Sequence, residues 1–481
     1  MRLIFQGHDH RYAVEQMVTM LLPQDPVTTE ASDPHQGLVT LTGDRAAAVF
    51  TVDGQQYQGA AELGEFGLDT PADRPAQEQR LVKMAAYRAL CQHTGKPAWG
   101  ALSGVRPAKL VRKWLERGAD SPQCAQLLTG LYDLDRDKAI LAIRCAQEAR
   151  EIDAQLGPRD LSVYIGIPFC PSRCAYCSFI SHDVKGALAM VEPYVDALER
   201  EIAWTGDYIL RKGLRLRSIY MGGGTPTTLS APQLDRLLTA LDRWPGRGEL
   251  AEFTVEAGRP DTITAEKLAV LKAHGVDRIS VNPQTLSDDV LRAMGRHHTA
   301  QQFRHAYALA RQTGFAAVNT DLIAGLPQDS EEGFRATLDE LLTLAPEEIT
   351  VHTLALKHGA GLLSSPQQLP SAEEVAAMLA YAAQVLPLAG YRPYYLYRQK
   401  YMTGAMENLG WTRRDRASFY NIVMMEELGS VLALGSGGVT KLIDRRGGAV
   451  KRHTNPKYPK EYLERLEEIL SQREALIWPT N

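Results

Sequence analysis

Between about residues 158 and 370, short apolar runs alternate with segments in which apolar positions recur every three or four residues. Each of the first five runs is followed by such a helical pattern, and 371–388 supplies a helix after the sixth. The predicted strands are 161–169, 216–221, 252–257, 278–283, 317–323 and 348–356. This alternation predicts an α/β fold with a parallel sheet. Six units are too few for a closed eight-stranded barrel, so we expect a partial (βα)6 TIM-like barrel with its active site at the carboxyl ends of the strands.

The regions on either side of this pattern differ from it. The N-terminal region, 1–157, predicts an α+β accessory domain. Its expected elements are a strand near 2–7, a helix near 10–22, a hairpin from 37–42 and 46–52, and helical segments near 78–92, 108–116 and 122–154. The C-terminal region, 371–481, predicts an α+β covering domain, leaving 158–370 for the barrel. Its stretch 390–401 is dense in aromatic and basic residues, which fits either substrate contact or an edge strand.

Composition narrows the class of protein. The 481 residues are 44% hydrophobic, and 53 basic minus 57 acidic side chains give a net charge of -4. This balance creates no general attraction for nucleic acid or an acidic membrane surface. The apolar start is too short for a signal sequence, and no run reaches the roughly 18 apolar residues of a membrane span. We therefore expect a soluble, cytoplasmic protein.

Half of the six cysteines lie within eight residues, directly after the first predicted barrel strand. Cys170, Cys174 and Cys177 are spaced by three residues and then two, and thiolates suit iron-sulfur clusters, zinc and copper(I). Structural zinc sites normally use four ligands. Three cysteines holding a 4Fe-4S cluster would leave one iron open for chemistry. The remaining cysteines, Cys91 among them, are interpreted as buried thiols in helices.

Polar residues mark the ends of several other predicted strands. Gly222-Gly-Gly-Thr-Pro226 follows the second strand, and three consecutive glycines allow the backbone to approach a ligand closely. Glu256 ends the third strand, Gln284 lies just past the fourth, and Asp321 lies on the fifth. Buried polar groups need partners, so these side chains either satisfy one another or hold a polar ligand. Three together favour the ligand.

For two further features, a structural interpretation is favoured over ligand binding. The loop 97–109 carries Trp99, Arg106 and Lys109, which could contact an acidic ligand, although a packed linker is the favoured interpretation. His297 and His298 could ligate a metal or haem, but a solvated helix end is favoured for them.

Together, the Cys-x3-Cys-x2-Cys motif, the Gly222–Pro226 loop and the strand-end Glu256 resemble the radical S-adenosylmethionine superfamily. The region of about 160–440 resembles its oxygen-independent coproporphyrinogen III oxidase-like branch. Two further segments, 100–110 and 394–400, are similar more narrowly to the HemZ group of that branch.

The resemblance implies a 4Fe-4S cluster and one or two molecules of S-adenosyl-L-methionine as cofactors. By position it assigns the metal ligands to Cys170, Cys174 and Cys177. The contacts it implies for the cluster and the first S-adenosylmethionine are Tyr164, Tyr176, Gly223, Gly224, Thr225 and Glu256. Those it implies for a second are Gln284, Arg296, Asp321 and Ala355. It assigns no catalytic residue.

Two positions depart from the oxidase pattern. Gly166 stands where the oxidase has a histidine, and Phe179 stands where it has an additional cysteine, with Ser178 before it. These departures affect the expected decarboxylation and leave the cluster untouched.

The leading hypothesis is a radical oxidoreductase of anaerobic haem biosynthesis, which decarboxylates coproporphyrinogen III propionates to the vinyl groups of protoporphyrinogen IX. It would need a one-electron donor such as flavodoxin or ferredoxin, and an electron acceptor. The alternatives are a haem-binding or haem-trafficking protein of the same branch without oxidase activity, or a radical enzyme with another substrate such as RNA. The net charge argues against RNA.

Overall fold

The computed structural model describes residues 1–30, 32–66, 74–177, 182–355, 362, 369–399, 402–445 and 449–479. The chain forms two compact units. Unit 1 comprises Met1–Arg144 and Tyr397–Glu407, and unit 2 comprises Cys145–Leu396 and Asn408–Asn481. The division of the sequence into 1–157, 158–370 and 371–481 remains a prediction.

Unit 1 is built on a four-stranded sheet with the order β1-β2-β3-β4. Its strands are β1 (Arg2–Gln6), β2 (Gln36–Thr42), β3 (Arg45–Val52) and β4 (Gln55–Glu62). The expected hairpin is the antiparallel pair β2 and β3. A second tight turn at Asp53 and Gly54, both with positive φ, adds β4, since such two-residue turns match the twist of paired strands.

The helices of unit 1 follow the expected segments closely. They are α1 (Arg11–Leu21), α2 (Arg74–Thr94), α3 (Pro107–Glu116), α4 (Ser121–Tyr132) and α5 (Arg136–Asp153), the last of which crosses the unit boundary. The single helical segment expected near 122–154 is two helices. Asp133, with φ 56°, adopts the left-handed conformation that ends α4.

Unit 2 contains the expected partial barrel. Six parallel strands lie side by side in the order β12-β11-β10-β9-β8-β5. They are β5 (Asp160–Ile167), β8 (Arg215–Gly223), β9 (Glu252–Glu256), β10 (Arg278–Ser280), β11 (Ala317–Ala324) and β12 (Glu348–Thr353). The six predicted strands are therefore confirmed, and their parallel pairing follows from the helix between each pair.

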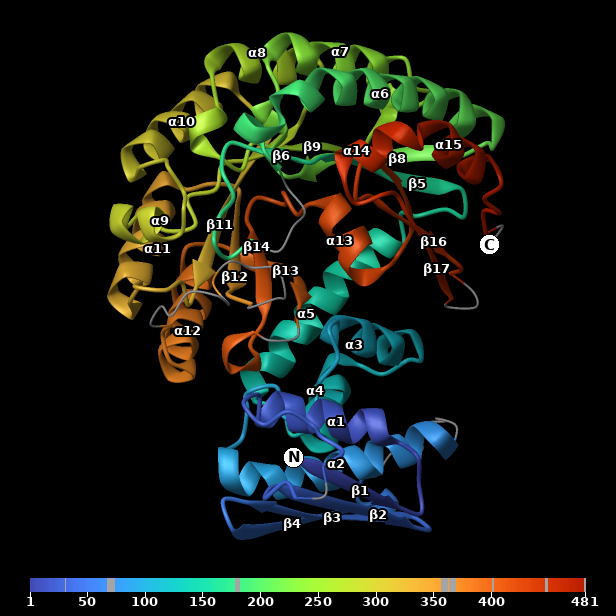
Figure 1. Ribbon diagram of the computed structural model, residues 1–481, viewed down its shortest axis with the longest axis vertical. Coiled ribbons are helices and arrows are strands. Elements are labelled where there is room, and N and C mark those ends of the chain that lie inside the picture. The colour runs from blue at the N-terminus through green and yellow to red at the C-terminus, as the bar shows by residue number, and fades with distance from the viewer. Residues whose placement is uncertain are drawn as a thin grey trace. The chain divides into compact units, whose positions relative to one another are not determined.

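Helices cover the outer side of this curved sheet (Figure 1). In chain order they are α6 (Val184–Arg211), α7 (Ala231–Asp242), α8 (Ala265–Ala273), α9 (Asp288–Ala293), α10 (Ala300–Thr313), α11 (Glu331–Leu344) and α12 (Ala372–Leu388). Several begin at a Ser or Thr that accepts a hydrogen bond from the first turn, as Ser230 does for α7 and Thr299 for α10. No helix within the described ranges is both long and apolar enough to cross a membrane.

The C-terminal region extends the same sheet at both edges. Beside β12 lie β14 (Asn408–Thr412), which is antiparallel to it, and then β13 (Arg392–Tyr397). At the other edge, β15 (Ser430–Leu434) pairs in parallel with β5 and is followed by β16 (Val439–Ile443) and β17 (Val450–Thr454). The short α13 (Phe419–Glu426) lies on the concave side of the sheet (Figure 1). The region thus both continues the barrel and covers its inner side.

Candidate functional site

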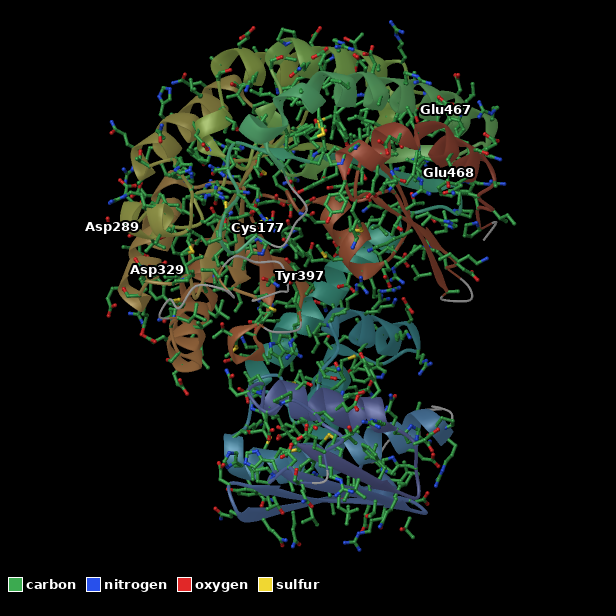
Figure 2. All side chains as sticks on the ribbon, in the orientation of Figure 1. Cys177, Asp289, Asp329, Tyr397, Glu467 and Glu468 are labelled. Carbon is green, nitrogen blue, oxygen red and sulfur yellow. The ribbon has the colours of Figure 1, made fainter. Side chains whose placement is uncertain are left out.

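The cysteine loop follows β5 at the carboxyl ends of the barrel strands. Cys170 ends the short strand β6 (Phe169–Cys170), which pairs with β7 (His182–Asp183). Cys174 is buried, whereas Cys170 and Cys177 are half-buried. Figure 2 shows Cys177 on the inner side of the barrel. The loop is tied to the segment after α9, because Ala175 donates to the Met294 carbonyl oxygen at 3.0 Å.

Hydrogen-bond donors lie close to the sulfurs of Cys170 and Cys174. Arg259 and Arg296 each direct a guanidinium nitrogen at Cys174 Sγ, at 3.8 and 3.9 Å, and Thr225 Oγ1 lies 3.5 Å from Cys170 Sγ. Two cations and a hydroxyl would offset the negative charge that thiolate ligands bring to an iron-sulfur cluster, and donors of this kind tune such clusters. The donor set therefore fits an anionic cluster.

No group of three Cys, His, Asp or Glu side chains in the described ranges is arranged to hold one metal ion. This is compatible with a cubane cluster, because each thiolate there binds a different iron and the sulfurs need not converge on one point. The loop does not have the geometry of a single-ion centre.

Both arginines are held firmly. Arg296 is buried and donates to the Tyr176 hydroxyl at 3.0 Å and to the carbonyl oxygens of Gly258 and Asn282 at 3.0 and 2.8 Å. Arg259 donates to the Ser172 carbonyl oxygen at 3.1 Å and forms an ion pair with Asp261 at 3.1 Å. Sequence reasoning identified Arg296 and missed Arg259. The available signal was its place directly after the third predicted strand.

The glycine loop passes closely over the start of the cysteine segment. The Gly224 and Thr225 amides donate to the carbonyl oxygens of Ile167 and Phe169 at 2.7 and 2.8 Å. A Cβ at Gly224 would lie 2.6 Å from the Phe169 oxygen, so a side chain cannot fit there without backbone movement. Gly223 has φ 109°, which L-residues rarely adopt. Gly224 is therefore required by close approach, and Gly223 by its backbone conformation.

Glu256 lies beside this loop at the end of β9. Its Oε2 accepts a hydrogen bond from the Gly223 amide at 3.1 Å, and its Oε1 accepts one from the Tyr220 hydroxyl at 2.5 Å. Burial raises the pKa of Glu256 to about 7. The Tyr220 ring stacks between Tyr164, at 6.3 Å between centroids, and Tyr420 of α13, at 4.5 Å. Tyr420 is a second residue near the site that sequence reasoning did not identify.

Gln284 and Asp321 are adjacent. The Gln284 amide donates to the Asp321 carbonyl oxygen at 2.9 Å. The Asp321 carboxylate accepts from the side-chain amides of Asn282 and Asn319, each at 2.7 Å. Gln284 has φ 67°, and its buried side-chain oxygen has no hydrogen-bond partner in the part of the chain that the structure describes. An unsatisfied buried acceptor is costly, so this atom favours a ligand that carries a donor. The last candidate, Ala355, lies just past β12 and is half-buried.

The space beside Gly166 is filled by the chain itself. A Cβ at this position would lie 3.0 Å from the Ser436 carbonyl oxygen and 3.4 Å from that of Leu434. Tyr194 fixes this arrangement, because its hydroxyl donates to the Gly166 oxygen and accepts from the Ser436 amide, both at 2.8 Å. A side chain at 166 would therefore require the turn after β15 to shift. Ser178 and Phe179, the other departure, lie outside the described residues.

The histidine pair divides between two environments. His297 is exposed, as a solvated helix end predicts, but His298 is buried, so the expectation is wrong for His298. Burial first, and then the charge of Arg296, lower the pKa of His298 to about 3, which keeps the ring neutral. Because one ring faces solvent and the other is enclosed, the pair does not form a joint ligand site.

The aromatic and basic stretch 390–401 supplies an edge strand. Residues 392–397 form β13, with Tyr394 and Tyr395 buried. Arg398 is also buried and donates to the carbonyl oxygens of Leu102 and Ala405 within unit 1. The edge-strand interpretation is therefore confirmed for 392–397. Lys400 and Tyr401 lie outside the described residues.

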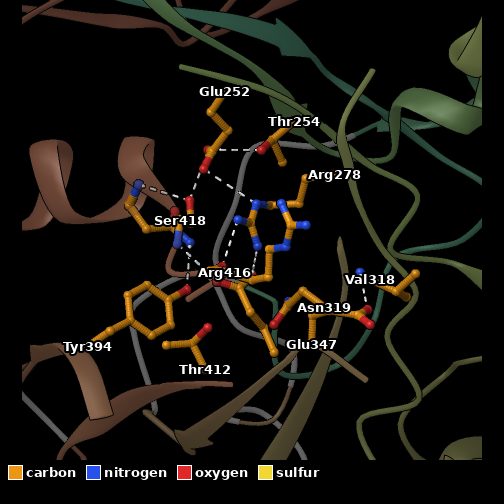
Figure 3. Close-up of polar contacts among 12 residues, drawn as sticks. Glu252, Thr254, Arg278, Val318, Asn319, Glu347, Tyr394, Thr412, Arg416 and Ser418 are labelled. Carbon is orange, nitrogen blue, oxygen red and sulfur yellow. Dashed lines mark hydrogen bonds and ion pairs between the residues drawn. The ribbon is translucent and has the colours of Figure 1, made fainter. Parts of the chain in front are cut away.

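A separate charge cluster occupies the amino ends of the strands. Arg278, at the start of β10, forms ion pairs with Glu252 at the start of β9, at 3.3 Å, and with Glu348 at the start of β12. Figure 3 shows the Glu252 carboxylate between Arg278 and Ser418, the residue that caps α13. Burial raises the pKa of Glu348 to about 7. The cluster binds the loop before α13 to the barrel, and Arg416 takes part through its carbonyl oxygen at 2.7 Å from Arg278.

Comparison with known proteins agrees with this arrangement. The model of the radical SAM superfamily matches residues 164–341. The chain is 39% identical over 403 residues to the oxygen-independent coproporphyrinogen-III oxidase-like protein HemZ of Bacillus subtilis, covering 82% of this chain and 80% of HemZ. It is 29% identical to the heme chaperone HemW of Escherichia coli, over 63% of this chain and 76% of HemW.

A solved structure shows the same fold. The coproporphyrinogen III oxidase HemN of Escherichia coli matches with a TM-score of 0.53 and 23% identity, over 68% of this chain and 73% of HemN. The cysteine loop, the similarity to HemZ along most of both chains and this shared fold lead to one assignment. The chain belongs to the radical SAM superfamily, whose members bind a 4Fe-4S cluster and S-adenosylmethionine, and within it to the coproporphyrinogen III oxidase-like branch that includes HemZ.

Proposed function

We propose that this protein is a radical enzyme of anaerobic haem biosynthesis that decarboxylates propionate side chains of coproporphyrinogen III to vinyl groups. The observation that carries the proposal is the grouping of the cysteine loop, the glycine loop and Glu256 at the carboxyl ends of three adjacent barrel strands. The name of HemZ, the relative that is similar along most of the chain, supports the substrate.

The residues would divide the work as follows. Cys170, Cys174 and Cys177 would hold the cluster, with Arg259 and Arg296 offsetting its charge. When bound and reduced, the cluster would supply the single electron for reductive cleavage of S-adenosylmethionine, and with it the hydrogen-abstracting radical chemistry of the superfamily.

Other side chains would orient S-adenosylmethionine. Glu256 and the glycine loop would hold its methionyl part, since the carboxylate already faces the Gly223 amide. The stacked rings of Tyr164, Tyr220 and Tyr420 would exclude water from the same edge. The unpartnered oxygen of Gln284, beside Asp321, would accept from a second S-adenosylmethionine.

The reaction must also balance its electrons. Each propionate would lose one hydrogen atom and one electron and would release carbon dioxide as the vinyl group forms. The cycle therefore needs a one-electron donor for the cluster, such as flavodoxin or ferredoxin, and an acceptor for the electron from the substrate.

One observation favours a second candidate, a haem-binding or haem-trafficking protein without oxidase activity. The oxidase pattern has a histidine where this chain has Gly166, and a Cβ at this position would lie 3.0 Å from the Ser436 carbonyl oxygen, so a side chain there would require the turn after β15 to shift. The similarity to HemW, a protein named as a heme chaperone, points the same way.

Anaerobic reconstitution with iron and sulfide, followed by reductant, S-adenosylmethionine and coproporphyrinogen III, tests the first candidate. Mass spectrometry should detect 5'-deoxyadenosine together with carbon dioxide loss from the tetrapyrrole. Cys174→Ala should lose both products and the cluster absorbance. Cys124→Ala, a matched change of a buried thiol in unit 1, should retain them.

The outcomes separate the candidates. Formation of 5'-deoxyadenosine without decarboxylation would reject the oxidase and keep the superfamily chemistry. A stoichiometric haem absorbance spectrum in the absence of decarboxylation would favour the second candidate. Full cofactor cleavage by Cys174→Ala would contradict the cluster assignment itself.

A further inference from the structure

Unit 1 contains a group of basic side chains that its described carboxylates do not balance. Arg80 and Lys83 lie on α2, Lys138 lies on α5, and Arg398 lies on the segment 397–407 that returns to this unit late in the chain. Glu407 is the carboxylate that acts on this group in the described ranges. Four positive charges minus one negative charge leave a local excess of three.

Arg398 forms the fixed base of this group. It is 6% exposed, and its guanidinium lies 5.2 Å from the centre of the Trp99 ring. Two of its nitrogens donate to the carbonyl oxygens of Leu102 and Ala405, while its buried Nε has no hydrogen-bond partner among the described residues. Burial lowers its pKa to about 10, so the group stays charged at neutral pH. The result is a rigid positive charge held away from water.

Glu407 cannot neutralise this charge alone, because it is already engaged by two other groups. The Trp99 indole Nε1 donates to its Oε2 at 2.7 Å, and the Lys138 ammonium pairs with its Oε1 at 2.5 Å. A carboxylate shared between an indole and an ammonium can offset only part of the field of Arg398.

Lys83 is the least compensated member. Its side chain is half-buried and lies on the same face of α2 as Arg80, three residues before it, and it has no hydrogen bond or ion pair within the described ranges. Burial first, and then the charges of Arg398 and Arg80, lower its pKa to about 8. Arg80 is also half-buried, with its guanidinium 5.9 Å from the Tyr132 ring. An ammonium held near two guanidiniums is unfavourable unless an anion joins them.

We propose that this group is a binding site for an oxyanion, a carboxylate or a phosphate, contacted by Lys83 and Arg80 and attracted by the buried charge of Arg398. Guanidinium and ammonium groups together suit such anions, and the flanking aromatic rings of Trp99 and Tyr132 would hold the cations in place. The site is independent of the barrel chemistry. It also differs from the expectation for loop 97–109, because its contacts come from α2 rather than from Arg106 and Lys109.

Thermal unfolding of the full-length protein tests the proposal. The melting temperature is measured at constant ionic strength, adjusted with chloride, against inorganic phosphate and, separately, against acetate, which carries a carboxylate only. A bound anion stabilises the folded state in a saturable way. We expect a saturable rise in Tm with at least one probe, and the probe that produces it identifies phosphate or carboxylate as the ligand.

Two variants complete the test. Lys83→Met should abolish the anion-dependent rise, and without anion its Tm should equal or exceed that of the wild type, since an unpaired charge is removed. Lys96→Met is the matched control, because Lys96 is already paired with Asp133 at 3.0 Å, and it should retain the rise. No saturable rise with either probe, or an equal rise in Lys83→Met, would overturn the proposal.

A chemical measurement serves if Lys83→Met does not fold. Carbamylation of the wild-type protein by cyanate at pH 8, followed by peptide mass spectrometry, reports the reactivity of each lysine amine. The stabilising anion should protect Lys83 several-fold and leave Lys96 unchanged. Equal modification of Lys83 with and without the anion would contradict the site.

Discussion

Each end of the barrel holds a buried glutamate whose pKa is raised to about 7, but the two carboxyl groups have different kinds of partner. At the amino end, Glu348 forms an ion pair with Arg278, which also contacts Glu252. At the carboxyl end, Glu256 has a phenol and a backbone amide as partners, and within the described ranges no basic side chain lies within ion-pair distance of it.

The difference separates a structural cluster from a binding site. The amino-end carboxylates are saturated by residues of the chain itself, including the first amides of α13. The carboxyl end retains Glu256, which lacks a cationic partner among the described residues, and the side-chain oxygen of Gln284, which lacks a hydrogen-bond donor among them. Both groups suit a ligand that carries positive charge and hydrogen-bond donors. This agrees with the general location of function at the carboxyl ends of barrel strands.

Removing the cation at the amino end should have the largest effect on stability. Arg278→Met leaves two buried carboxylates without their shared partner, and breaking such a pair costs about 3–5 kcal/mol. The free energy of unfolding from a urea titration measures this loss. Arg292→Met, on an arginine whose side chain is 72% exposed, should change it by less than about 0.5 kcal/mol. If Arg278→Met left the free energy of unfolding unchanged, the carboxylates at the amino end would not be buried charges.

At the carboxyl end, the glycine loop should be the most sensitive backbone. Gly224→Ala brings a Cβ to 2.6 Å from the Phe169 oxygen, and such overpacking costs about 1–3 kcal/mol. The loop should also shift against the cysteines and lower the iron retained after reconstitution. Gly186→Ala, in α6 with no atom within 4 Å of the new Cβ, should stabilise by up to about 1 kcal/mol. If Gly224→Ala retained as much iron as the wild type, the position of the cysteine loop would not depend on the glycine loop.

The pH dependence of stability distinguishes the two glutamates. A carboxyl with a folded-state pKa of about 7 and an unfolded value of 4.5 keeps its proton in the folded state while the unfolded chain releases it. Stability should therefore fall as pH rises from about 5 to 7, by at most about 1.4 kcal/mol per pH unit for each group. Glu256→Gln should remove its share of this decline without breaking an ion pair.

The control for this measurement is Glu467→Gln, because the side chain of Glu467 is 76% exposed. Its unfolding profile between pH 5 and 8 should parallel that of the wild type. If Glu256→Gln also leaves the slope unchanged, Glu256 is ionised across this range and the contrast between the two ends disappears.

The smallest effect is expected at Tyr420. Its hydroxyl is buried and has no hydrogen-bond partner among the described residues, so Tyr420→Phe should change the free energy of unfolding by less than about 1 kcal/mol while keeping the ring stack. Tyr220→Phe is the paired comparison, because it removes the hydrogen bond to Glu256 and should cost about 1–2 kcal/mol. A larger loss in Tyr420→Phe than in Tyr220→Phe would reverse the assignment of partners.

The barrel strands were predictable because parallel strands covered on both faces appear as continuous apolar runs. The main difference is β10, which ends at Ser280 rather than near 283. The left-handed conformation of Gln284 follows shortly after it, and periodicity carries no signal for that conformation in a glutamine. The pairing of β15 with β5 was not predictable either, since an apolar pattern does not specify which distant strand it joins.

The candidate site was predictable where a polar residue interrupts an apolar run, as at Glu256 and Asp321. Arg259 and Tyr420 were missed for different reasons. Arg259 resembles any basic loop residue, and its approach to Cys174 appears only in three dimensions. Tyr420 reaches the site from α13, far along the chain, and its apolar neighbours suggest ordinary burial.

The return of residues 397–407 to unit 1 has a consequence for biosynthesis. The indole of Trp99 donates a hydrogen bond to Glu407, which lies 308 residues further along the chain. At a translation rate of about 5–20 residues per second, roughly 15–60 s separate the two residues on the ribosome. During that interval all six parallel barrel strands emerge, so unit 1 begins first but stays incomplete until residues 397–407 follow those strands, and until then its nascent form lacks the carboxylate partner of Trp99.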